Sequence, residues 1–266
     1  MDFAERYGPW AVIAGASEGT GRAFARRIAA SGVNCVLLAR REEPLRTLAE
    51  EIRADGGADC AIAAVDLSAP DATARIAEAV GPREVGLFVA NAGADTNGAR
   101  FLDRDLDAWL QLIRMNVLTV AGCCHHFGGR MKARGRGGLL IVNSGACYGG
   151  GSHMAAYSGS KAFELAFAEG LWAELQPHGV DVLSLVLGKT DTPAFRALLA
   201  EKGLPVPDDL ASPDVVAETG LAQLRHGPIH NFGLANNAGG WGYGSADERR
   251  KRVEMVSASS KVVFGD

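Results

Sequence analysis

The stretch Ser144-Gly145-Ala146-Cys147-Tyr148-Gly149-Gly150-Gly151-Ser152-His153-Met154-Ala155-Ala156-Tyr157-Ser158-Gly159-Ser160-Lys161 joins two regular elements through a glycine-rich loop. A hydrophobic run at 139–142 precedes it and a helical pattern at 163–175 follows it, so we expect a strand, a loop and a helix. Tyr157 and Lys161 are four residues apart, which places them on one face of a helix. Ser144 ends the expected strand, where open α/β sheets bind their ligands. A hydroxyl, a phenol and an ammonium are therefore expected in one crevice.

Strand and helix patterns alternate along the rest of the chain. Apolar runs predict strands at 10–14, 33–39, 60–65, 85–90, 139–143 and 180–187, with a short last strand near 229–234. Amphipathic periodicity predicts helices at 19–31, 42–54, 71–80, 106–132 and 154–176. This alternation is typical of α/β proteins, so we expect a doubly wound (Rossmann) parallel sheet of about seven strands. Helices would cover both faces of one domain spanning residues 1–266.

Two regions interrupt the alternation. Residues 190–210 contain three prolines around an apolar, helix-like segment, and we expect an insertion that covers the crevice as a substrate lid. The C-terminal tail, 227–266, is rich in glycine, asparagine and aromatic residues. A charged helix is expected within it, near 246–256.

The overall composition narrows the possible partners and compartments. The 266 residues carry a net charge of −4, and the dense basic run at 249–252 follows two acidic residues, so no nucleic-acid surface is expected. Charges or glycines interrupt every apolar run, so no membrane span is expected. Five cysteines without regular spacing, and no signal-peptide pattern at the beginning, predict a reduced, cytoplasmic setting.

The run Cys123-Cys124-His125-His126 has the residue types of a metal site. Adjacent residues on a straight helix point about 100° apart, so these four side chains cannot all bind one ion. Packing in the core or at a subunit interface is the preferred interpretation. We therefore expect no metal.

The segment Gly15-Ala16-Ser17-Glu18-Gly19-Thr20-Gly21 joins the first predicted strand to the first predicted helix. Its glycines let the backbone approach a bulky anion, and the N–H groups at the helix start would point at a pyrophosphate. A plain tight turn is the alternative reading of glycines at this spacing. The position between strand and helix favours a dinucleotide-binding cradle.

The ends of the next strands carry candidate contacts for the rest of a dinucleotide. Asp66-Leu67 could receive the adenine amino group, or Asp66 could cap a helix. Asn91-Ala92-Gly93 is small enough to admit the adenosine ribose, or it forms an ordinary turn. Arg40 and Arg41 follow the second strand, where an acid is expected for NAD and an arginine for a 2′-phosphate. They predict NADP(H), although they could instead solvate a helix start.

Together these motifs resemble the short-chain dehydrogenase/reductase family across nearly the whole chain. The matching pieces are Gly15-x-x-x-Gly19-x-Gly21, Asn91-Ala92-Gly93, Asn116, Ser144 thirteen residues before Tyr157, Lys161, and Gly188-x-x-x-Thr192. A narrower resemblance, to the branch with bacterial NADP-dependent 7β-hydroxysteroid dehydrogenases, rests on Tyr7-Gly8-x-Trp10, Arg40-Arg41-Glu42-Glu43 and Leu187-Gly188-Lys189-Thr190-x-Thr192-Pro193. The chain departs from the family at Ala14, Ala90 and Leu187, where threonine, asparagine and proline are usual.

The resemblance implies hydride transfer between NADP(H) and a substrate carbonyl or alcohol. Tyr157 would exchange a proton with the substrate oxygen, and Ser144 would hydrogen-bond that oxygen and hold its developing charge. A free phenol has a pKa of about 10. The Lys161 ammonium would lower this pKa, because it favours the phenolate.

The resemblance also implies roles on the cofactor side of the site. Lys161 would bind the hydroxyls of the nicotinamide ribose, and the backbone of Asn116 would hold a water that links Lys161 to solvent. Thr192 would contact the nicotinamide amide, with Gly188 and Thr190 counted among the cofactor-binding residues. The family habit of pairing the helices that hold Asn116 and the catalytic tyrosine suggests a homodimer or homotetramer.

The expected substrate is a small, hydrophobic secondary alcohol or ketone, with hydroxysteroids among the candidates. His153 could face it or be a polar loop residue; candidate walls that could equally be core are Tyr148, Phe195, Leu198 and Trp241. An NADP(H)-binding regulator without turnover is the alternative from another class. The complete set of proton-transfer residues disfavours it, and an epimerase or dehydratase ranks lower still.

Overall fold

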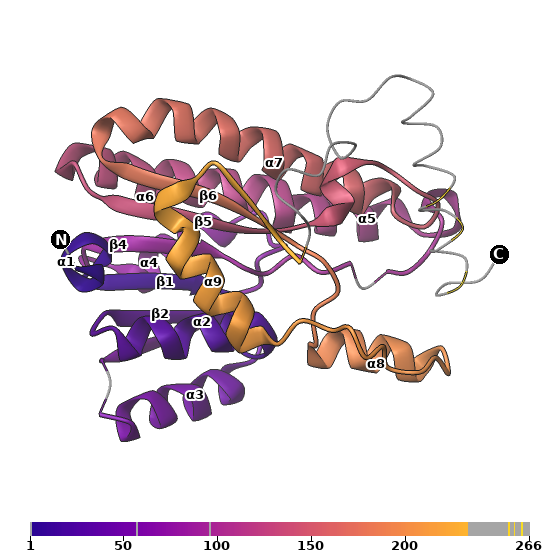
Figure 1. Ribbon diagram of the computed structural model, residues 1–266, viewed down its shortest axis with the longest axis horizontal. Helices are drawn as coiled ribbons and strands as arrows, with labels where there is room; N and C mark the ends of the chain where they lie inside the picture. Colours follow the sequence, from indigo (N-terminus) through magenta and orange to yellow (C-terminus); the bar gives the residue numbers. More distant parts are fainter. Residues whose placement is uncertain are drawn as a thin grey trace.

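The computed structural model describes residues 2–56, 58–95 and 97–233, together with Met255, Ala258 and Val262. At its centre lies a seven-stranded sheet whose paired strands are all parallel, in the order β3-β2-β1-β4-β5-β6-β7 (Figure 1). In chain order the strands are β1 (Trp10–Ala14), β2 (Asn34–Ala39), β3 (Cys60–Ala64), β4 (Val85–Ala90), β5 (Gly137–Ser144), β6 (Val180–Leu187) and β7 (Ile229–Phe232). The predicted doubly wound sheet is confirmed. Strand order reverses between β1 and β4, which is where such sheets form their ligand crevice.

Helices cover both faces of the sheet (Figure 1). In chain order they are α1 (Phe3–Tyr7), α2 (Gly19–Ala30), α3 (Glu42–Ala54), α4 (Ala72–Val80), α5 (Leu106–Ile113), α6 (Val120–Arg134), α7 (Ala155–Leu175), α8 (Pro193–Glu201) and α9 (Pro213–Gln223). Short helical turns are η1 (Phe101–Asp103), η2 (Arg114–Thr119), η3 (Gly145–Tyr148), η4 (Gln176–His178) and η5 (Leu224–His226). One buried cluster joins the sheet to α2, α3 and α9, and a second joins it to α4, α6 and α7.

The alternation of side chains along β1 explains both clusters. Ala11 and Ile13 belong to the cluster under α2, whereas Val12 and Ala14 belong to the cluster under α6. Successive side chains of a strand point to opposite faces, so a strand covered on both sides must be apolar at every position. The unbroken apolar runs of the sequence have this origin.

The helix predicted at 106–132 is interrupted, because η2 is a π-helical turn between α5 and α6. Asn116 lies within this turn and is fully buried. Its Nδ2 donates to the Gly93 carbonyl at 3.3 Å and to Ser160 Oγ at 2.9 Å. These tertiary hydrogen bonds hold a turn that helical periodicity alone does not reveal. Such π turns frequently lie at functional sites.

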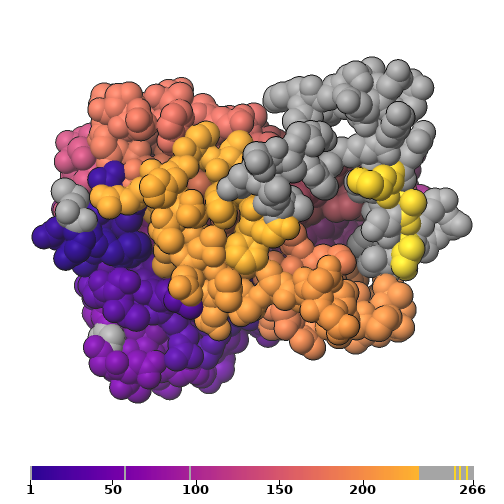
Figure 2. All heavy atoms as spheres, in the orientation of Figure 1, coloured from indigo at the N-terminus to yellow at the C-terminus, as the bar shows by residue number. Residues whose placement is uncertain are grey.

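Two elements near the chain ends were absent from the sequence prediction, namely α1 and α9. The hydroxyl of Ser212 caps α9 by accepting from Asp214 N at 3.3 Å, and Pro213 occupies the first helical turn. Figure 2 shows α9 over the middle of this face, with α8 at its edge. The segment at 190–210 thus contains α8, and its role as a lid stays a prediction.

The predictions for the tail are only partly covered. The last strand is present as β7, within the predicted bounds 229–234. The basic run at 249–252, Trp241 and, apart from Met255, the charged helix near 246–256 lie outside the described residues. None of the helices in the described part of the chain has the length and apolarity needed to cross a membrane.

Candidate active site

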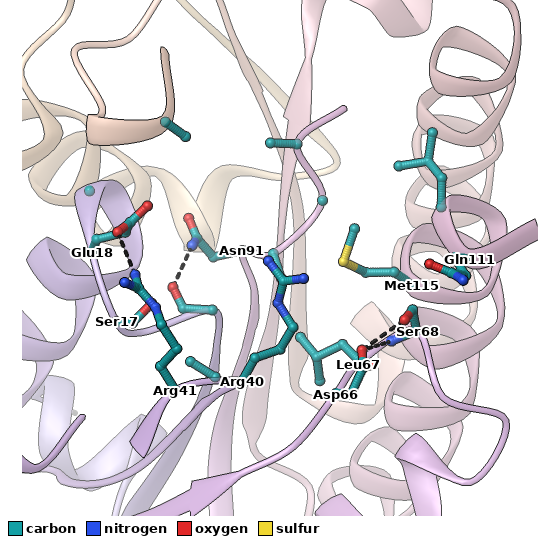
Figure 3. Close-up of a pocket in the computed structure, with 18 of the residues that line it drawn as sticks. Ser17, Glu18, Arg40, Arg41, Asp66, Leu67, Ser68, Asn91, Gln111 and Met115 are labelled. Carbon is teal, nitrogen blue, oxygen red and sulfur yellow. Dashed lines mark hydrogen bonds and ion pairs between the residues drawn. The ribbon is translucent and has the colours of Figure 1, made fainter. Parts of the chain in front are cut away.

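A cavity of about 340 Å³ opens at the carboxyl ends of β1 and β4, where the strand order reverses. Figure 3 shows side chains converging on it from the ends of several strands. The predicted cofactor residues that line it are Gly15, Ser17, Glu18, Gly19, Thr20, Arg40, Arg41, Asp66, Leu67, Asn91, Ala92, Gly93 and Thr192. The predicted cofactor residues that do not line it are Gly21, Tyr157, Lys161, Gly188 and Thr190. The fold therefore brings most of the predicted dinucleotide contacts to one cavity.

The cradle between β1 and α2 tolerates no larger residues at two of its glycines. Gly15 has a φ of +84°, in the left-handed region that favours glycine, and a Cβ there would lie 2.9 Å from Ala92 N. A Cβ on Gly21 would lie 1.9 Å from the Gly15 carbonyl oxygen. Asn91 fastens the loop, because its Nδ2 donates to the Gly15 carbonyl at 3.0 Å and its Oδ1 accepts from Thr20 Oγ1 at 2.7 Å. A close-packed backbone at a helix start fits a pyrophosphate group.

Arg40 and Arg41 both border the cavity, on the side of the strand ends (Figure 3). Arg41 Nη2 lies 3.0 Å from Glu18 Oε2, whereas no described residue forms an ion pair with Arg40. Asp66 Oδ1 accepts from the Ser68 backbone at 2.9 Å and from the Ser68 hydroxyl at 2.7 Å. These bonds, and more weakly the charge of Arg40, lower the pKa of Asp66. A carboxylate and two guanidinium groups thus border one end of the cavity.

The Ser144 and Tyr157 side chains meet beside this cavity. Ser144 ends β5, and its hydroxyl accepts from Ala146 N at 3.3 Å. Burial raises the pKa of Tyr157, while the Lys161 ammonium and a hydrogen bond with Ser144 lower it. The expected effect of Lys161 is present, but the loss of water around the phenol outweighs it.

Lys161 is 2% exposed, and its Nζ donates to the Val142 carbonyl at 3.0 Å. A Cβ on Gly93 would lie 3.0 Å from Nζ, so the ammonium adjoins a residue that lines the cavity. Asn116 is close to the same point, because its Oδ1 would lie 2.8 Å from that Cβ. This Oδ1 is buried and has no hydrogen-bond partner in the described structure. A polar acceptor and a donor therefore flank Gly93 at the floor of the cavity.

The predicted nicotinamide-side residues differ in position. Thr192 lines the cavity and caps α8, its hydroxyl accepting from Phe195 N at 3.2 Å. Thr190 instead bridges to Ala211 in a short parallel pairing, and its hydroxyl donates to the Gly188 carbonyl at 3.4 Å. Gly188 and Thr190 thus shape the segment that leads from β6 into α8.

The loop after Ser144 is held against the sheet near its beginning. The Tyr148 hydroxyl donates to Asn231 Oδ1 at 2.6 Å, which ties η3 to β7. His153 is 6% exposed with a φ of +65°, and its Nδ1 lies 3.0 Å from Ser152 Oγ.

Cavity residues that sequence reasoning missed are Ala39, Val65, Ser68, Ala94, Asn97, Ala108, Gln111, Leu112, Met115 and Ala194. Several come from α5, whose place beside the crevice follows from the topology rather than from any motif.

The cysteine and histidine run in α6 serves packing. Cys123 and Cys124 are buried, and His126 meets the Phe127 ring edge-on at 5.0 Å between centroids. Across the residues with described positions, no three His, Cys, Asp or Glu side chains gather where they could hold a metal ion.

Comparison with known proteins agrees with this geometry. A family model described as short chain dehydrogenase matches residues 9–203. A 7beta-hydroxysteroid dehydrogenase of Collinsella aerofaciens is 34% identical over 199 residues, 75% of each chain. A structure solved to explain 7beta-hydroxysteroid dehydrogenase stereoselectivity superposes with a TM-score of 0.86 at 28% identity, covering 96% of this chain and 100% of that one. A metagenomic short-chain oxidoreductase in complex with NADP has a TM-score of 0.68 at 28% identity, covering 84% and 92%.

The family match spans β1 through α8, and so includes the cradle, the Ser144–Lys161 stretch and Thr192. The cradle and Thr192 line the cavity at the reversal of strand order, and Lys161 adjoins it at Gly93. On both grounds, this chain belongs to the short-chain dehydrogenase family of oxidoreductases.

Proposed function

We propose that this protein transfers a hydride between NADP(H) and a hydrophobic secondary alcohol or ketone, with hydroxysteroids as the leading substrate class. The observation that carries the proposal is the meeting of Ser144, Tyr157 and Lys161 beside a cradle that only glycines can form. Relatives named as 7beta-hydroxysteroid dehydrogenases support the substrate class. The relative solved with NADP supports the cofactor.

The proposed cofactor contacts follow from the cavity. The cradle would hold the pyrophosphate, Asp66 the adenine, and Arg40 with Arg41 the 2′-phosphate. Lys161 would donate to the nicotinamide ribose. When bound, the nicotinamide supplies or accepts the hydride.

Tyr157 is the proposed proton donor for ketone reduction and the proton acceptor for alcohol oxidation. Ser144 would donate a hydrogen bond to the substrate oxygen and orient its carbon toward the cofactor side of the cavity. The positive charge of Lys161 lowers the pKa of Tyr157 and offsets part of the effect of burial. Asn116 Oδ1, which is buried and unpartnered, is a site for an ordered water beside Lys161.

The proposed surroundings of the site are a lid and a subunit contact. Residues 190–210 would close over the substrate, since Thr192 and Ala194 border the cavity. Leu106, Leu110 and Leu118 are exposed along α5 and η2, as is Phe163 on α7. This apolar face would pair two copies of the chain in a homodimer or homotetramer.

The decisive experiment follows NADPH oxidation over a panel of ketones that includes keto-steroids. We expect turnover with bulky hydrophobic ketones and a loss of at least a thousandfold in Tyr157→Phe, which should still fold and bind NADPH. Retained turnover in that variant would refute the proton-transfer role. Tight NADPH binding with no turnover on any ketone would favour a regulatory protein instead.

A further inference from the structure

A second charged residue is buried next to Lys161. Glu164 is 1% exposed, and its Oε1 and Oε2 lie 3.1 Å and 2.8 Å from Lys161 Nζ. With the Val142 carbonyl at 3.0 Å, three oxygens lie within hydrogen-bond distance of the ammonium in the core. Neither the sequence motif nor the family match assigns a role to Glu164.

The position of Glu164 on α7 links it to the proton-transfer residues. Tyr157, Lys161 and Glu164 lie at i, i+4 and i+7, so they share one face of the helix. The same face continues with Ala168 and Leu175, both buried and apolar. An apolar side chain at position 164 would therefore continue the core of α7.

Burial of a carboxylate at such a position is energetically unfavourable. Removing two charges from water is unfavourable, and replacing a buried ion pair with apolar residues is often neutral or stabilising. Packing alone therefore does not account for Glu164. Both of its oxygens instead lie within hydrogen-bond distance of the ammonium that the proposed reaction needs.

The titratable groups around this pair lie on four segments of the chain. Lys161 meets Glu164 on α7 and Cys147 on η3, while Tyr157 also experiences Asp95 from the loop after β4. Burial raises the pKa of Glu164 and the Lys161 ammonium opposes that rise. On α6, the carboxylate adds to the burial that raises the pKa of the Cys124 thiol.

Glu164 and Lys161 have opposite effects on Tyr157. The ammonium lowers the pKa of Tyr157, and the carboxylate raises it. Because Lys161 Nζ lies against both Glu164 oxygens, part of its field at the phenol is cancelled.

We propose that Glu164 is a positioning residue for Lys161, which anchors the ammonium against Val142 and Gly93 and limits the positive charge felt by Tyr157. This inference rests on the proton-transfer role proposed above. Its consequence is that Tyr157 remains a phenol to higher pH than Lys161 alone would allow. The site is thereby biased toward giving a proton to a ketone.

The test uses Glu164→Gln, which keeps the shape and an acceptor oxygen but removes the charge. The phenolate absorbance of Tyr157 is titrated in the protein alone, as the difference from Tyr157→Phe in the same background, over the pH range in which circular dichroism is unchanged. We expect the Tyr157 phenolate to appear about one pH unit lower than in the parent. Glu174→Gln, an exposed site on the same helix, should leave the titration unchanged.

Kinetics supply the second readout. In Glu164→Gln, the pH profiles of alcohol oxidation and ketone reduction should both shift to lower pH by about the same amount. Glu164→Met, which keeps the volume with an apolar side chain, serves if Glu164→Gln folds poorly and should give the same shift. A stability change without any shift in the Tyr157 titration would overturn the proposal, because Glu164 would then be structural only.

Two further outcomes separate this inference from the proposed function. A rise in the Tyr157 pKa in Glu164→Gln would overturn the inference, because the charge of Lys161 would then depend on its partner. The expected shift in a protein that reduces no ketone would support the inference about Glu164 and Lys161, and would overturn the proposed function alone.

Discussion

Replacement of Arg40 by alanine should change the preference for NADPH over NADH more than it changes folding. Both guanidinium groups at the end of β2 border the cavity, but they are not equivalent. Arg41 is paired with Glu18 at 3.0 Å, which offsets part of its charge, whereas Arg40 has no ion pair within the described residues. Arg40 is therefore the freer cation for a 2′-phosphate.

The expected size follows from the strength of a charge-assisted contact. A hydrogen bond to a charged group contributes about 1.5–3 kcal/mol, and about 1.4 kcal/mol corresponds to a tenfold change. Arg40→Ala should therefore lower kcat/KM for NADPH by about 10- to 150-fold. Exposure of the side chain to solvent favours the lower part of this range. The value for NADH should change less than about threefold, because NADH has no phosphate at that position.

The assay measures kcat/KM for both cofactors with one ketone, together with the Kd of each cofactor from fluorescence titration. Arg41→Ala is expected to lose less than about tenfold with NADPH, since Glu18 already offsets part of the Arg41 charge in the parent protein. Arg46→Ala, an exposed arginine on α3 paired with Glu42, is the matched control and should alter neither ratio. Equal losses with NADPH and NADH in Arg40→Ala, or an unchanged ratio, would refute the reasoning.

Three further predictions concern the cradle, the fold and the reaction direction. Gly21→Ala would place a Cβ 1.9 Å from a backbone oxygen. It should destabilise the protein by about 1–3 kcal/mol and weaken NADPH binding at least tenfold. A variant whose melting temperature in the presence of NADPH equals that of the parent protein would contradict this. Asp181→Ala removes the partner of Arg6, held at 2.5 Å and 2.8 Å, and should cost about 3 kcal/mol in urea unfolding. Asp191→Ala, at the exposed pair with Arg196, should cost clearly less. Ketone reduction needs the phenol of Tyr157 and alcohol oxidation needs the phenolate. As the pH rises through the pKa of Tyr157, kcat/KM for reduction should therefore fall and kcat/KM for oxidation should rise. Because burial raises that pKa, a shared midpoint on the acid side of neutrality would contradict the structure.

Local sequence patterns determine most of the fold. The predicted bounds of β1, α3, β4 and β6 coincide with the structure, because unbroken apolar runs and strong amphipathic periodicity mark buried strands and half-buried helices. Alternation also predicts parallel strands, since strands with helical crossovers place their carboxyl ends at one edge of the sheet. This topology brings Arg40, Asp66 and Asn91 to the same cavity as the cradle, although they are far apart in the chain.

Features that depend on tertiary contacts were less visible. The π turn at Asn116 is held by hydrogen bonds to Gly93 and Ser160, two partners from other parts of the chain. Helix α9 has a recognisable start at Ser212-Pro213, but its apolar residues do not form a clear stripe. Its packing against α2 compensates for that weak pattern.

The role inferred for Glu164 shows how a sequence can contain a signal that motif reading passes over. An acid within a helix is ordinarily read as a solvated residue, and the tyrosine–lysine motif ends at Lys161. Yet any helix that turns Lys161 into a site at its core must also turn position 164 inward, because the two are three residues apart on one face. The sequence therefore required a buried carboxylate beside the ammonium, and a buried carboxylate requires a cation. The structure meets both requirements with the contact between Lys161 and Glu164. The electrostatic field that Tyr157 experiences therefore comes from the pair rather than from Lys161 alone.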